Sequence, residues 1–363
     1  MSEMLLSELT TVNVGGSAKK YVRATSEAEI IEAVKAADAA GENLLVVGGG
    51  SNLIVGDEGF DGTVVHIASK GIERDDTPSC GGAIVRVQAG HSWDDLVAYT
   101  VDKEYSGLEA LSGIPGTVGA TPVQNVGAYG SEVAHTIFRV RTWDRKTGNL
   151  KTFAPADLKF AYRHSLLKET TVNGSPRYVV LTVDFQLAFG SRSAPIRYAE
   201  LAYTLGVEVG ERADAPTVRE TVLKLRAGKG MVLDASDRDT YSTGSFFTNP
   251  IVDESARKNL PEDAPAYPAT DARGQVLDGK IKLSAAWLIQ HAGFEKGFGL
   301  EGEAAELTGA RASLSTKHTL AITNRGGATA EDLMSIARAV RDGVFSSFGI
   351  ELVPEPVIVG THI

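Results

Sequence analysis

The chain has 363 residues, more than one hydrophobic core usually serves, so we expect two or three domains. Hydrophobic residues make up 43% and charged residues 23%, as in ordinary globular proteins, while the net charge of −10 argues against general binding to nucleic acid or to anionic membranes. Cys80 is the single cysteine, which excludes an internal disulfide and is typical of the reducing cytoplasm, where we expect the protein to act.

Two further classes are excluded by what the sequence lacks. No apolar run approaches the roughly 18 residues of a membrane-spanning helix, and the acidic start lacks the cationic region of a secretion signal. Histidine and cysteine do not recur with the spacing of zinc sites, so we expect no metal.

Apolar spacing and capping residues predict a mixture of helices and strands in the first half. Ser26 and Glu29 form a capping box before apolar residues at helical spacing, and Gly41 ends this helix. A second capped helix begins at Ser92 and continues to residue 103. Strands are expected at residues 44–47, 63–67, 84–88, 138–143 and 177–187.

The second half is also mixed. The composition changes near residue 190, and we place a domain boundary between residues 190 and 214. Residues 217–220 resemble a capping box at the start of another helix, and helices are expected at 284–292 and 329–348. Residues 261–279, rich in Pro, Asp and Ala, are expected to form an exposed loop, and residues 351–360 a final strand. The whole pattern indicates an α+β protein.

A glycine-rich segment at residues 113–130 is the most informative part of the chain. It reads GIPGTVGATPVQNVGAYG, with five glycines, two prolines and almost no charge. Glycine lets a backbone approach a ligand closely and offer bare N–H groups, and proline holds such a loop rigid. The segment is either a shaped cradle for a large phosphate-bearing ligand or a tightly turned loop of the core.

The first glycine cluster in chain order, Gly48-Gly-Gly-Ser-Asn52, follows a predicted strand. It fails the dinucleotide fingerprint G-x-G-x-x-G because residue 53 is leucine, and no P-loop motif occurs anywhere. The cluster is therefore either an ordinary turn or a nest of N–H groups that holds a pyrophosphate without a Rossmann helix.

Three residues stand in contexts that suit chemistry. Arg163 lies beside Tyr162 in an apolar stretch and carries a planar fork suited to a carboxylate or phosphate. Ser245 lies between a glycine and two phenylalanines, where its hydroxyl could give a proton to a carbanionic centre. Glu355 stands between two prolines in an apolar strand. The alternatives are a surface ion pair for Arg163, a turn for Ser245 and an exposed edge for Glu355.

The cationic residues near these motifs have two interpretations. Lys224, Arg226 and Lys229 end one predicted helix, and Lys282 precedes another. They either bind phosphate or are solvated charges on helix ends.

Together these motifs resemble, in order and spacing, the UDP-N-acetylenolpyruvoylglucosamine reductase family over residues 11–360, nearly the whole chain. Besides the glycine-rich segment 113–130, the matching stretches are LLVVGGGSNL at 44–53, FAYRHS at 160–165, GSFFTNP at 244–250, KLSAAWLI at 282–289 and PEPV at 354–357. The segments 261–279 and 301–311 depart from the family pattern, and we assign them no role.

The resemblance implies an α+β fold with an FAD-binding part of the vanillyl-alcohol-oxidase (PCMH) type. Residues 1–78 and 79–205 would form its two subdomains, residues 206–350 a smaller α+β substrate-binding domain, and residues 351–363 a C-terminal strand that carries Glu355. It also implies an oxidoreductase of peptidoglycan precursor synthesis, with non-covalent FAD, with NADPH as reductant and with a UDP-linked aminosugar as substrate. We expect a monomer.

The resemblance also assigns residues. Arg163, Ser245 and Glu355 would be catalytic. The expected FAD contacts are Gly48, Gly49, Gly50, Ser51, Asn52, Leu53, Ile114, Pro115, Gly119, Ala120, Thr121, Asn125 and Gly127. The expected substrate contacts are Tyr162, Tyr198, Lys229, Asn249 and Lys282, with Tyr198 on a loop that closes over the substrate.

The chemistry can also be reasoned from the reaction itself. An alkene conjugated to a carboxylate accepts hydride at its β carbon and becomes an enolate at its α carbon. Arg163 would hold the carboxylate and oppose the growing charge, and Ser245 would protonate the α carbon. Glu355 would either hydrogen-bond the enolate form while protonated or relay a proton.

Two rival functions remain open on sequence alone. The first is a flavin oxidase of the same fold that uses O₂ on a sugar or alcohol, and such oxidases often link the flavin to a histidine or cysteine. None of the candidates has a convincing attachment context; they are His66, Cys80, His91, His135 and His164. The second is a UDP-sugar-binding protein without catalysis, which would be colourless when purified.

Overall fold

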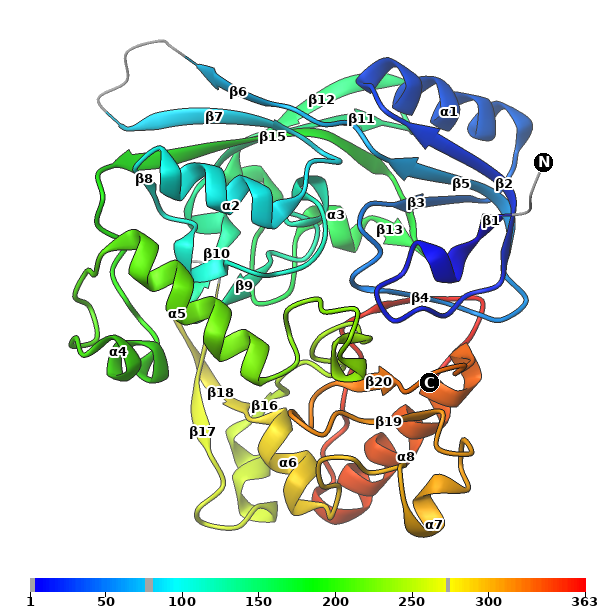
Figure 1. The fold of residues 1–363 in the computed structure, drawn as a ribbon, viewed down its shortest axis with the longest axis vertical. Coiled ribbons are helices and arrows are strands. Elements are labelled where there is room, and N and C mark those ends of the chain that lie inside the picture. Colours follow the sequence, from blue (N-terminus) through cyan, green and yellow to red (C-terminus); the bar gives the residue numbers. More distant parts are fainter. Residues whose placement is uncertain (1–3, 76–80, 272–274) are drawn as a thin grey trace. The chain divides into compact units, whose positions relative to one another are not determined.

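The computed structural model describes residues 4–75, 81–271 and 275–363 (Figure 1). Cys80 lies outside these residues, as does part of the segment 261–279. The chain groups into two compact units, which are described separately below. Unit 1 contains residues 1–18, 50–60 and 233–363, and unit 2 contains residues 19–49 and 61–232. The finer four-part division expected from the sequence stays a prediction.

Unit 2 is built on a twisted antiparallel sheet with strand order β12-β11-β15-β7-β6, and β8 also pairs with β15. These strands are β6 (Ile72–Asp75), β7 (Ala83–Gln88), β8 (Tyr105–Ser106), β11 (Ile137–Asp144), β12 (Asn149–Phe153) and β15 (Tyr178–Phe189). β15 lies centrally, and its Val183 faces Val140 of β11 and Val87 of β7. The strand is buried without interruption from Tyr178 to Phe185, and this buried run includes the polar residues Thr182 and Asp184, of which Asp184 is paired with Arg86.

Helix α2 (Trp93–Asp102) lies along one face of this sheet (Figure 1). The Ser92 side chain accepts from the backbone N–H of Asp95 and so caps the helix, as the sequence predicts. The Trp93 ring packs against Phe185 of β15 with ring centroids 5.9 Å apart. The cap and the first turn therefore fix the chain on the sheet just before the glycine-rich segment begins.

A second sheet in unit 2 contains β2 (Ser17–Ala24), β5 (Phe60–Ile67) and β3 (Leu44–Val47), with β3 and β5 parallel. Helix α1 (Glu27–Ala40) is capped by Ser26 and ends at Gly41, whose φ of 64° is left-handed. Its buried face joins one apolar core with both sheets of the unit.

The remaining elements of unit 2 are short or lie at its end. They are β9 (Gly127–Ala128), β10 (Ser131–Glu132), α3 (Leu166–Glu169), β13 (Thr171–Val172), β14 (Ser175–Pro176), α4 (Ala199–Leu205) and α5 (Ala215–Gly228). Helix α5 starts before the predicted cap, because Asp214 rather than Thr217 accepts the hydrogen bond of the first turn and Pro216 suits that turn.

Unit 1 is organised around α8 (Ala330–Phe348), which packs against the hairpin of β19 (Ala312–Leu314) and β20 (Ile322–Asn324) (Figure 1). Thr329 and Asp332 form its capping box, and Gly349 ends it. The buried face of α8 shares an apolar core with α6 (Ala285–His291). The other elements are β1 (Met4–Leu5), β4 (Leu53–Val55), β16 (Ile251–Asp253), β17 (Ala266–Thr270), β18 (Val276–Leu283), α7 (Gly302–Ala305) and β21 (Val357–Val359).

Two sequence expectations in unit 1 were wrong. The segment 261–279 is not a plain loop, because β17 lies within it and β18 begins within it. The two strands pair in a sheet with order β16-β18-β17. The pairing of Tyr267 with Lys282 overrides the weak strand propensity of the Pro- and Ala-rich sequence. The strand expected at 351–360 is confined to β21, which pairs in parallel with β4.

Candidate functional site

Two glycine turns lie against each other in unit 2. A Cβ atom on Gly48 would lie 2.3 Å from the Oγ1 of Thr117, and one on Gly49 would lie 2.7 Å from the Cα of Gly116. Such distances leave no room for a side chain at either glycine. The contact joins the first glycine cluster to the start of the glycine-rich segment 113–130, and its members are half-buried.

The glycine-rich segment is anchored to the sheet by backbone hydrogen bonds. The N–H of Gly119 donates to the carbonyl of Ala89 at 2.8 Å, and that of Val118 donates to His91 at 2.9 Å. A Cβ on Gly119 would lie 2.5 Å from the Cβ of Ala89, so only glycine allows this approach. At the start of the segment, the N–H of Gly113 donates to the carboxylate of Asp94 at 2.6 Å. The segment is thus a rigid, packed turn rather than a linker.

The next part of the segment organises the turn that carries Arg163. Asn125, whose φ is 49°, is buried, and its amide group donates to Glu132 at 2.7 Å and to the carbonyl of Ala161 at 3.1 Å. The carbonyl of Gly127 accepts from Nη2 of Arg163 at 2.9 Å. Asn125 and Gly127, both expected to bind cofactor, therefore lie beside an expected catalytic residue.

Arg163 projects from a tight turn between Ala161 and His164, which exchange two backbone hydrogen bonds of 3.1 Å. Its φ of 53° is left-handed, a conformation that costs energy in a residue with a Cβ. The guanidinium lies 5.3 Å from the ring centroid of Tyr162. The turn holds the cation half-buried beside an aromatic face, a setting that suits binding of a planar anion.

The chain's own geometry fits a dinucleotide at the glycine cradle, defined here as Gly48, Gly49 and residues 113–121. At Gly48, Gly49 and Gly119 the close neighbours are backbone atoms or the short side chains of Thr117 and Ala89, an arrangement that suits phosphate binding by backbone N–H groups. Beside it, both ring nitrogens of His91 are buried and lack a hydrogen-bond partner among the described residues. Burial lowers the pKa of His91, so its neutral ring offers one donor and one acceptor to a bound group.

An aromatic and cationic cluster gathers two expected substrate contacts in unit 2. Tyr198, which precedes α4 and is exposed, meets Tyr129 edge-on with ring centroids 5.5 Å apart. The ammonium of Lys229 lies 5.8 Å from the Tyr129 ring and pairs with Glu200 at 2.8 Å. Although partial burial opposes its charge, the Glu200 hydrogen bond raises the pKa of Lys229, so it stays cationic. This cluster could receive a phosphate beside aromatic surface.

Unit 1 holds Ser245 and Glu355 on adjoining segments. Gly244 has a φ of 75°, and the N–H of Phe246 donates to the carbonyl of Leu320 at 2.7 Å, so the turn is fixed on both sides of Ser245. The N–H of Glu355 donates to the carbonyl of Phe246 at 2.7 Å. The side chains of Phe246 and Phe247 are buried below the turn, which leaves Ser245 half-buried above an apolar wall.

The pairing of β4 with β21 brings Asn52 to the same place. The N–H of Val357 donates to the carbonyl of Asn52 at 2.9 Å, and the Asn52 side chain donates to the carbonyl of Glu355 at 3.3 Å. The second half of the first glycine cluster, Gly50 to Leu53, therefore belongs to unit 1 together with Ser245 and Glu355.

The other expected substrate contacts of unit 1 also adjoin one another. The side chain of Asn249 accepts from the backbone N–H of Ala285, the first residue of α6, at 3.0 Å, while Ser284 caps the helix. Lys282 pairs with Ile251 across β18 and β16, and the N–H of Leu283 donates to Pro250 at 2.8 Å. Asn249 and Lys282 thus lie near the same end of the β16–β18 pair, and Asn249 is four residues after Ser245 in the chain.

The expected site residues therefore form two sets. Unit 2 gathers Gly48, Gly49, Ile114, Pro115, Gly119, Ala120, Thr121, Asn125, Gly127, Tyr162, Arg163, Tyr198 and Lys229, and unit 1 gathers Gly50, Ser51, Asn52, Leu53, Ser245, Asn249, Lys282 and Glu355. Sequence reasoning did not single out Gly116, Thr117 and Tyr129, although all three lie within the glycine-rich segment.

Two kinds of feature are absent from the parts of the chain that the structure describes. No helix in residues 4–75, 81–271 and 275–363 combines the length and apolar character needed to cross a bilayer. Within the same ranges, His, Cys, Asp and Glu nowhere gather in a group of three or more that could hold a metal ion.

Comparisons with known proteins agree with this arrangement. Residues 18–154 match the model of an FAD binding domain, and residues 236–359 match that of the UDP-N-acetylenolpyruvoylglucosamine reductase C-terminal domain. A Cutibacterium acnes protein named UDP-N-acetylenolpyruvoylglucosamine reductase is 52% identical, covering 99% of this chain and 90% of that protein. One of the same name from Saccharopolyspora erythraea is also 52% identical, covering 98% and 94%.

A solved structure has the same fold. The crystal structure of UDP-N-acetylenolpyruvylglucosamine reductase from Thermus caldophilus aligns with a TM-score of 0.62 at 23% identity, covering 99% of this chain and 98% of that one. The fold and the first family model define the class: the chain is an FAD-binding oxidoreductase of α+β architecture. More narrowly, it belongs to the UDP-N-acetylenolpyruvoylglucosamine reductase family. The family, fold class, enzyme class and FAD expected from the sequence are thus confirmed.

Proposed function

We propose that this chain reduces the enolpyruvyl group of UDP-N-acetylenolpyruvoylglucosamine to give UDP-N-acetylmuramate for peptidoglycan precursors, with NADPH as the source of electrons. The names of its close relatives support the reaction. The observation that carries the residue assignment is the hydrogen bond from Glu355 to Phe246, because it joins a carboxylate segment to the hydroxyl-bearing turn.

In this proposal the glycine cradle of unit 2 binds FAD. When bound, FAD supplies the hydride-transfer chemistry. Gly48, Gly49 and Gly119 are the residues at which a side chain would collide with neighbouring atoms, so they keep the backbone close enough to hold a pyrophosphate. His91, with its two buried ring nitrogens, would bond a polar edge of the cofactor.

Arg163 holds the substrate carboxylate. Its guanidinium is a permanent cation with a planar fork, and its position on a left-handed turn is fixed by the bond from Nη2 to Gly127. As charge develops on the carboxylate and the adjoining carbon, a fixed cation stabilises the transition state more than the ground state.

Ser245 gives the proton to the α carbon. Its hydroxyl leaves a turn fixed by Gly244 and Phe246 over buried aromatic rings, where little water competes for it. Serine is a very weak acid in water, but a carbanion-like acceptor in hydrogen-bond reach makes the transfer feasible. Glu355, on the adjoining segment, either donates to the enolate while protonated or returns a proton to the serine.

The polar contacts farther from the reacting carbons hold the nucleotide part. Lys229 lies over Tyr129 beside Tyr198 and supplies charge for a diphosphate. Tyr198 is exposed at the start of α4 and covers the bound substrate, and Asn249 and Lys282 are further substrate contacts in this proposal. We further propose that the enzyme works as a monomer in the cytoplasm.

The decisive experiment follows the visible spectrum of the purified holoprotein without oxygen. NADPH is expected to bleach the flavin, and UDP-N-acetylenolpyruvoylglucosamine to restore its absorbance in equal amount. Restoration by oxygen together with a sugar or alcohol, but not by this substrate, would identify the oxidase alternative. A colourless protein that binds UDP-sugars without turnover would contradict the proposal in favour of a binding protein.

A further inference from the structure

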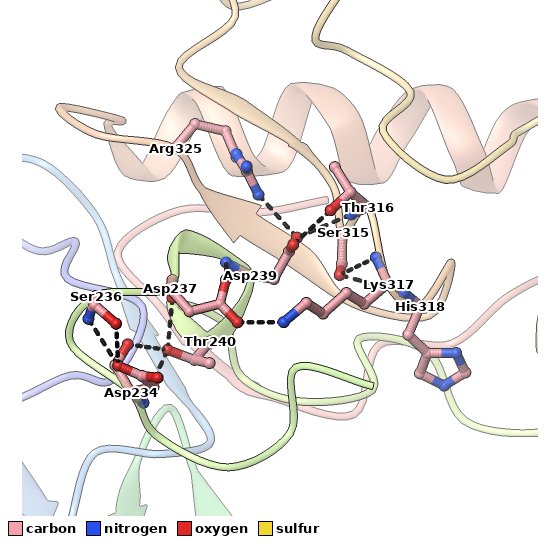
Figure 2. Close-up of polar contacts among 10 residues, drawn as sticks. All are labelled: Asp234, Ser236, Asp237, Asp239, Thr240, Ser315, Thr316, Lys317, His318 and Arg325. Carbon is pink, nitrogen blue, oxygen red and sulfur yellow. Dashed lines mark hydrogen bonds and ion pairs between the residues drawn. The ribbon is translucent and has the colours of Figure 1, made fainter. Parts of the chain in front are cut away.

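An ion-pair cluster in unit 1 connects residues 234–240 with residues 315–325 (Figure 2). Asp239, at 4% exposure, accepts at one carboxylate oxygen from the N–H of Thr316 at 2.8 Å and from the Arg325 guanidinium at 2.8 Å. Its other oxygen accepts from the Thr316 hydroxyl at 2.5 Å. Although burial opposes the charge, these bonds lower the pKa of Asp239, so it is an anion at neutral pH.

A second ion pair ties the same two segments together. The carboxylate of Asp237 accepts from Lys317 at 2.5 Å and from the backbone N–H of Asp239 at 3.0 Å (Figure 2). The loop that carries Lys317 is itself closed, because the Ser315 hydroxyl accepts from the N–H groups of Lys317 and His318, at 3.0 and 3.2 Å. Residues 234–240 therefore hold a preformed loop, residues 315–321, by two buried or half-buried pairs.

This loop in turn holds the Ser245 turn. Its Leu320 carbonyl accepts from the N–H of Phe246 at 2.7 Å. On the other side of Ser245, Ser242 forms a β-bridge with Thr323 at the end of the same hairpin. Ser245 thus lies between two attachments to one hairpin, and Asp239 fixes the loop that provides one of them.

We propose that Asp239 is a positioning residue for Ser245, because its ion-paired carboxylate fixes the 315–321 loop and the loop's Leu320 carbonyl aims the turn that carries the hydroxyl. This inference rests on the proposed function of Ser245 as proton donor. Proton transfer to carbon requires the donor within hydrogen-bond reach of the acceptor, so a small shift of the turn affects this step more than substrate binding.

A matched control is available in the same unit. Asp332 is also a buried aspartate with a paired arginine, Arg311, bonded at 2.8 and 2.9 Å, and it caps the start of α8. Asp332→Asn removes the same charge from the same kind of pair. It is therefore expected to cost comparable stability without acting on the 315–321 loop.

The test compares the holoprotein variants Asp239→Asn and Asp332→Asn in the two half-reactions. For Asp239→Asn we expect flavin reoxidation by substrate to slow by about 10- to 100-fold, with an increased solvent deuterium isotope effect and nearly unchanged KM. Flavin content and bleaching by NADPH should match the wild type. Asp332→Asn should leave both half-reactions and the isotope effect unchanged while lowering the thermal midpoint.

Equal effects of the two variants, or loss of both half-reactions together, would overturn the inference, because Asp239 would then act only through stability. If Asp239→Asn does not fold, Thr316→Val decides, since it removes one donor to Asp239 and should slow reoxidation in the same direction. Ser245→Ala separates the two proposals. If it leaves reoxidation intact, the serine assignment itself is wrong; if it abolishes reoxidation while Asp239→Asn behaves as wild type, only the positioning role is wrong.

Discussion

The backbone N–H of Glu355 donates to the carbonyl oxygen of Phe246 at 2.7 Å, and Phe246 directly follows Ser245. A second bond of the same ladder joins the N–H of Thr248 to the carbonyl of Val353 at 3.0 Å. Two segments remote in sequence are thus held side by side by an antiparallel β-bridge between Phe247 and Pro354, with a hydroxyl on one segment and a carboxylate on the other. These backbone hydrogen bonds fix the relative positions of the two segments, so the side chains of Ser245 and Glu355 project from a rigid backbone rather than from mobile loops.

Removing the Ser245 hydroxyl is expected to stop substrate reduction alone. For Ser245→Ala we predict that reoxidation by substrate falls by about 10²- to 10³-fold or more, because no acid remains at the α carbon. Bleaching by NADPH does not use this proton and should continue at the wild-type rate. Anaerobic stopped-flow absorbance separates the two steps.

Ser346→Ala is the matched control, since Ser346 is an exposed serine of the same unit that lies on α8, away from the Ser245 turn in sequence. Its two half-reactions should equal those of the wild type. Wild-type reoxidation in Ser245→Ala would contradict the assignment of the acid.

Filling the contact between the two glycine turns should release the flavin. A Cβ on Gly49 would lie 2.7 Å from the Cα and 3.1 Å from the carbonyl carbon of Gly116, so Gly49→Ala must separate the two turns. We expect a lower flavin absorbance per protein and a higher Kd for FAD in titrations of the apoprotein.

The control for this prediction is Gly228→Ala. Gly228 ends α5, and a Cβ there would meet nothing within 4 Å, so the substitution should be neutral or stabilising by up to about 1 kcal/mol. Full flavin occupancy in Gly49→Ala would show that the close packing of the turns does not serve the cofactor.

The sequence predicts those parts of the fold that local chemistry determines. Three helices are capped by Ser26, Ser92 and Thr329, whose side chains each accept from the N–H group three residues further on. The sequence predicts the start of each of these helices within a residue or two. The strands β17 and β18 were missed because their stability comes from pairing, which their Pro- and Ala-rich sequence does not indicate.

For the candidate site, sequence motifs could select Ser245, Glu355 and Arg163 individually, because their neighbours are unusual. They could not indicate that Glu355 pairs with Phe246, nor that Asp239 fixes the loop bonded to it, since these contacts join distant segments. The first glycine cluster is continuous in sequence, as either an ordinary turn or a nest would be, whereas its glycines divide between two compact units after Gly49. Contacts of this kind follow from topology rather than from local pattern.

Neutralising Lys229 should weaken substrate binding more than chemistry. Its ammonium lies over Tyr129 and carries the charge assigned to the diphosphate. A hydrogen bond between charged groups contributes about 1.5–3 kcal/mol, so Lys229→Met should raise KM by about 10- to 100-fold, with a smaller change in kcat. Steady-state kinetics at low and high salt provide the measurement, and the gap between variant and wild type should narrow with salt.

Lys224→Met provides the control because Lys224 is an exposed lysine of α5, the helix that ends just before Lys229. It should leave KM unchanged. An equal rise in KM for both variants would indicate a general field effect of helix charge rather than a contact with substrate.

Acid is expected to destabilise the protein through a set of aspartates, of which Asp144, Asp239 and Asp332 are buried and Asp94 is half-buried. Arginine hydrogen bonds lower the pKa of Asp144, and bonds from Arg219, Thr316 and Arg311 outweigh burial to lower the pKa values of Asp94, Asp239 and Asp332. Because the folded state binds these protons more weakly than the unfolded state, the stabilisation is complete above the ordinary aspartate value of 3.8 and is lost as the pH falls through the folded values. Urea unfolding at a series of pH values should therefore show a midpoint urea concentration that falls steeply below about pH 4.

Asp144→Asn removes one of the carboxyl groups whose pKa is lowered in the folded state. The midpoint of this variant should therefore be lower than that of the wild type at neutral pH but fall less steeply in acid. A flat or rising wild-type midpoint below about pH 4 would mean that these ion pairs do not favour the folded state over water.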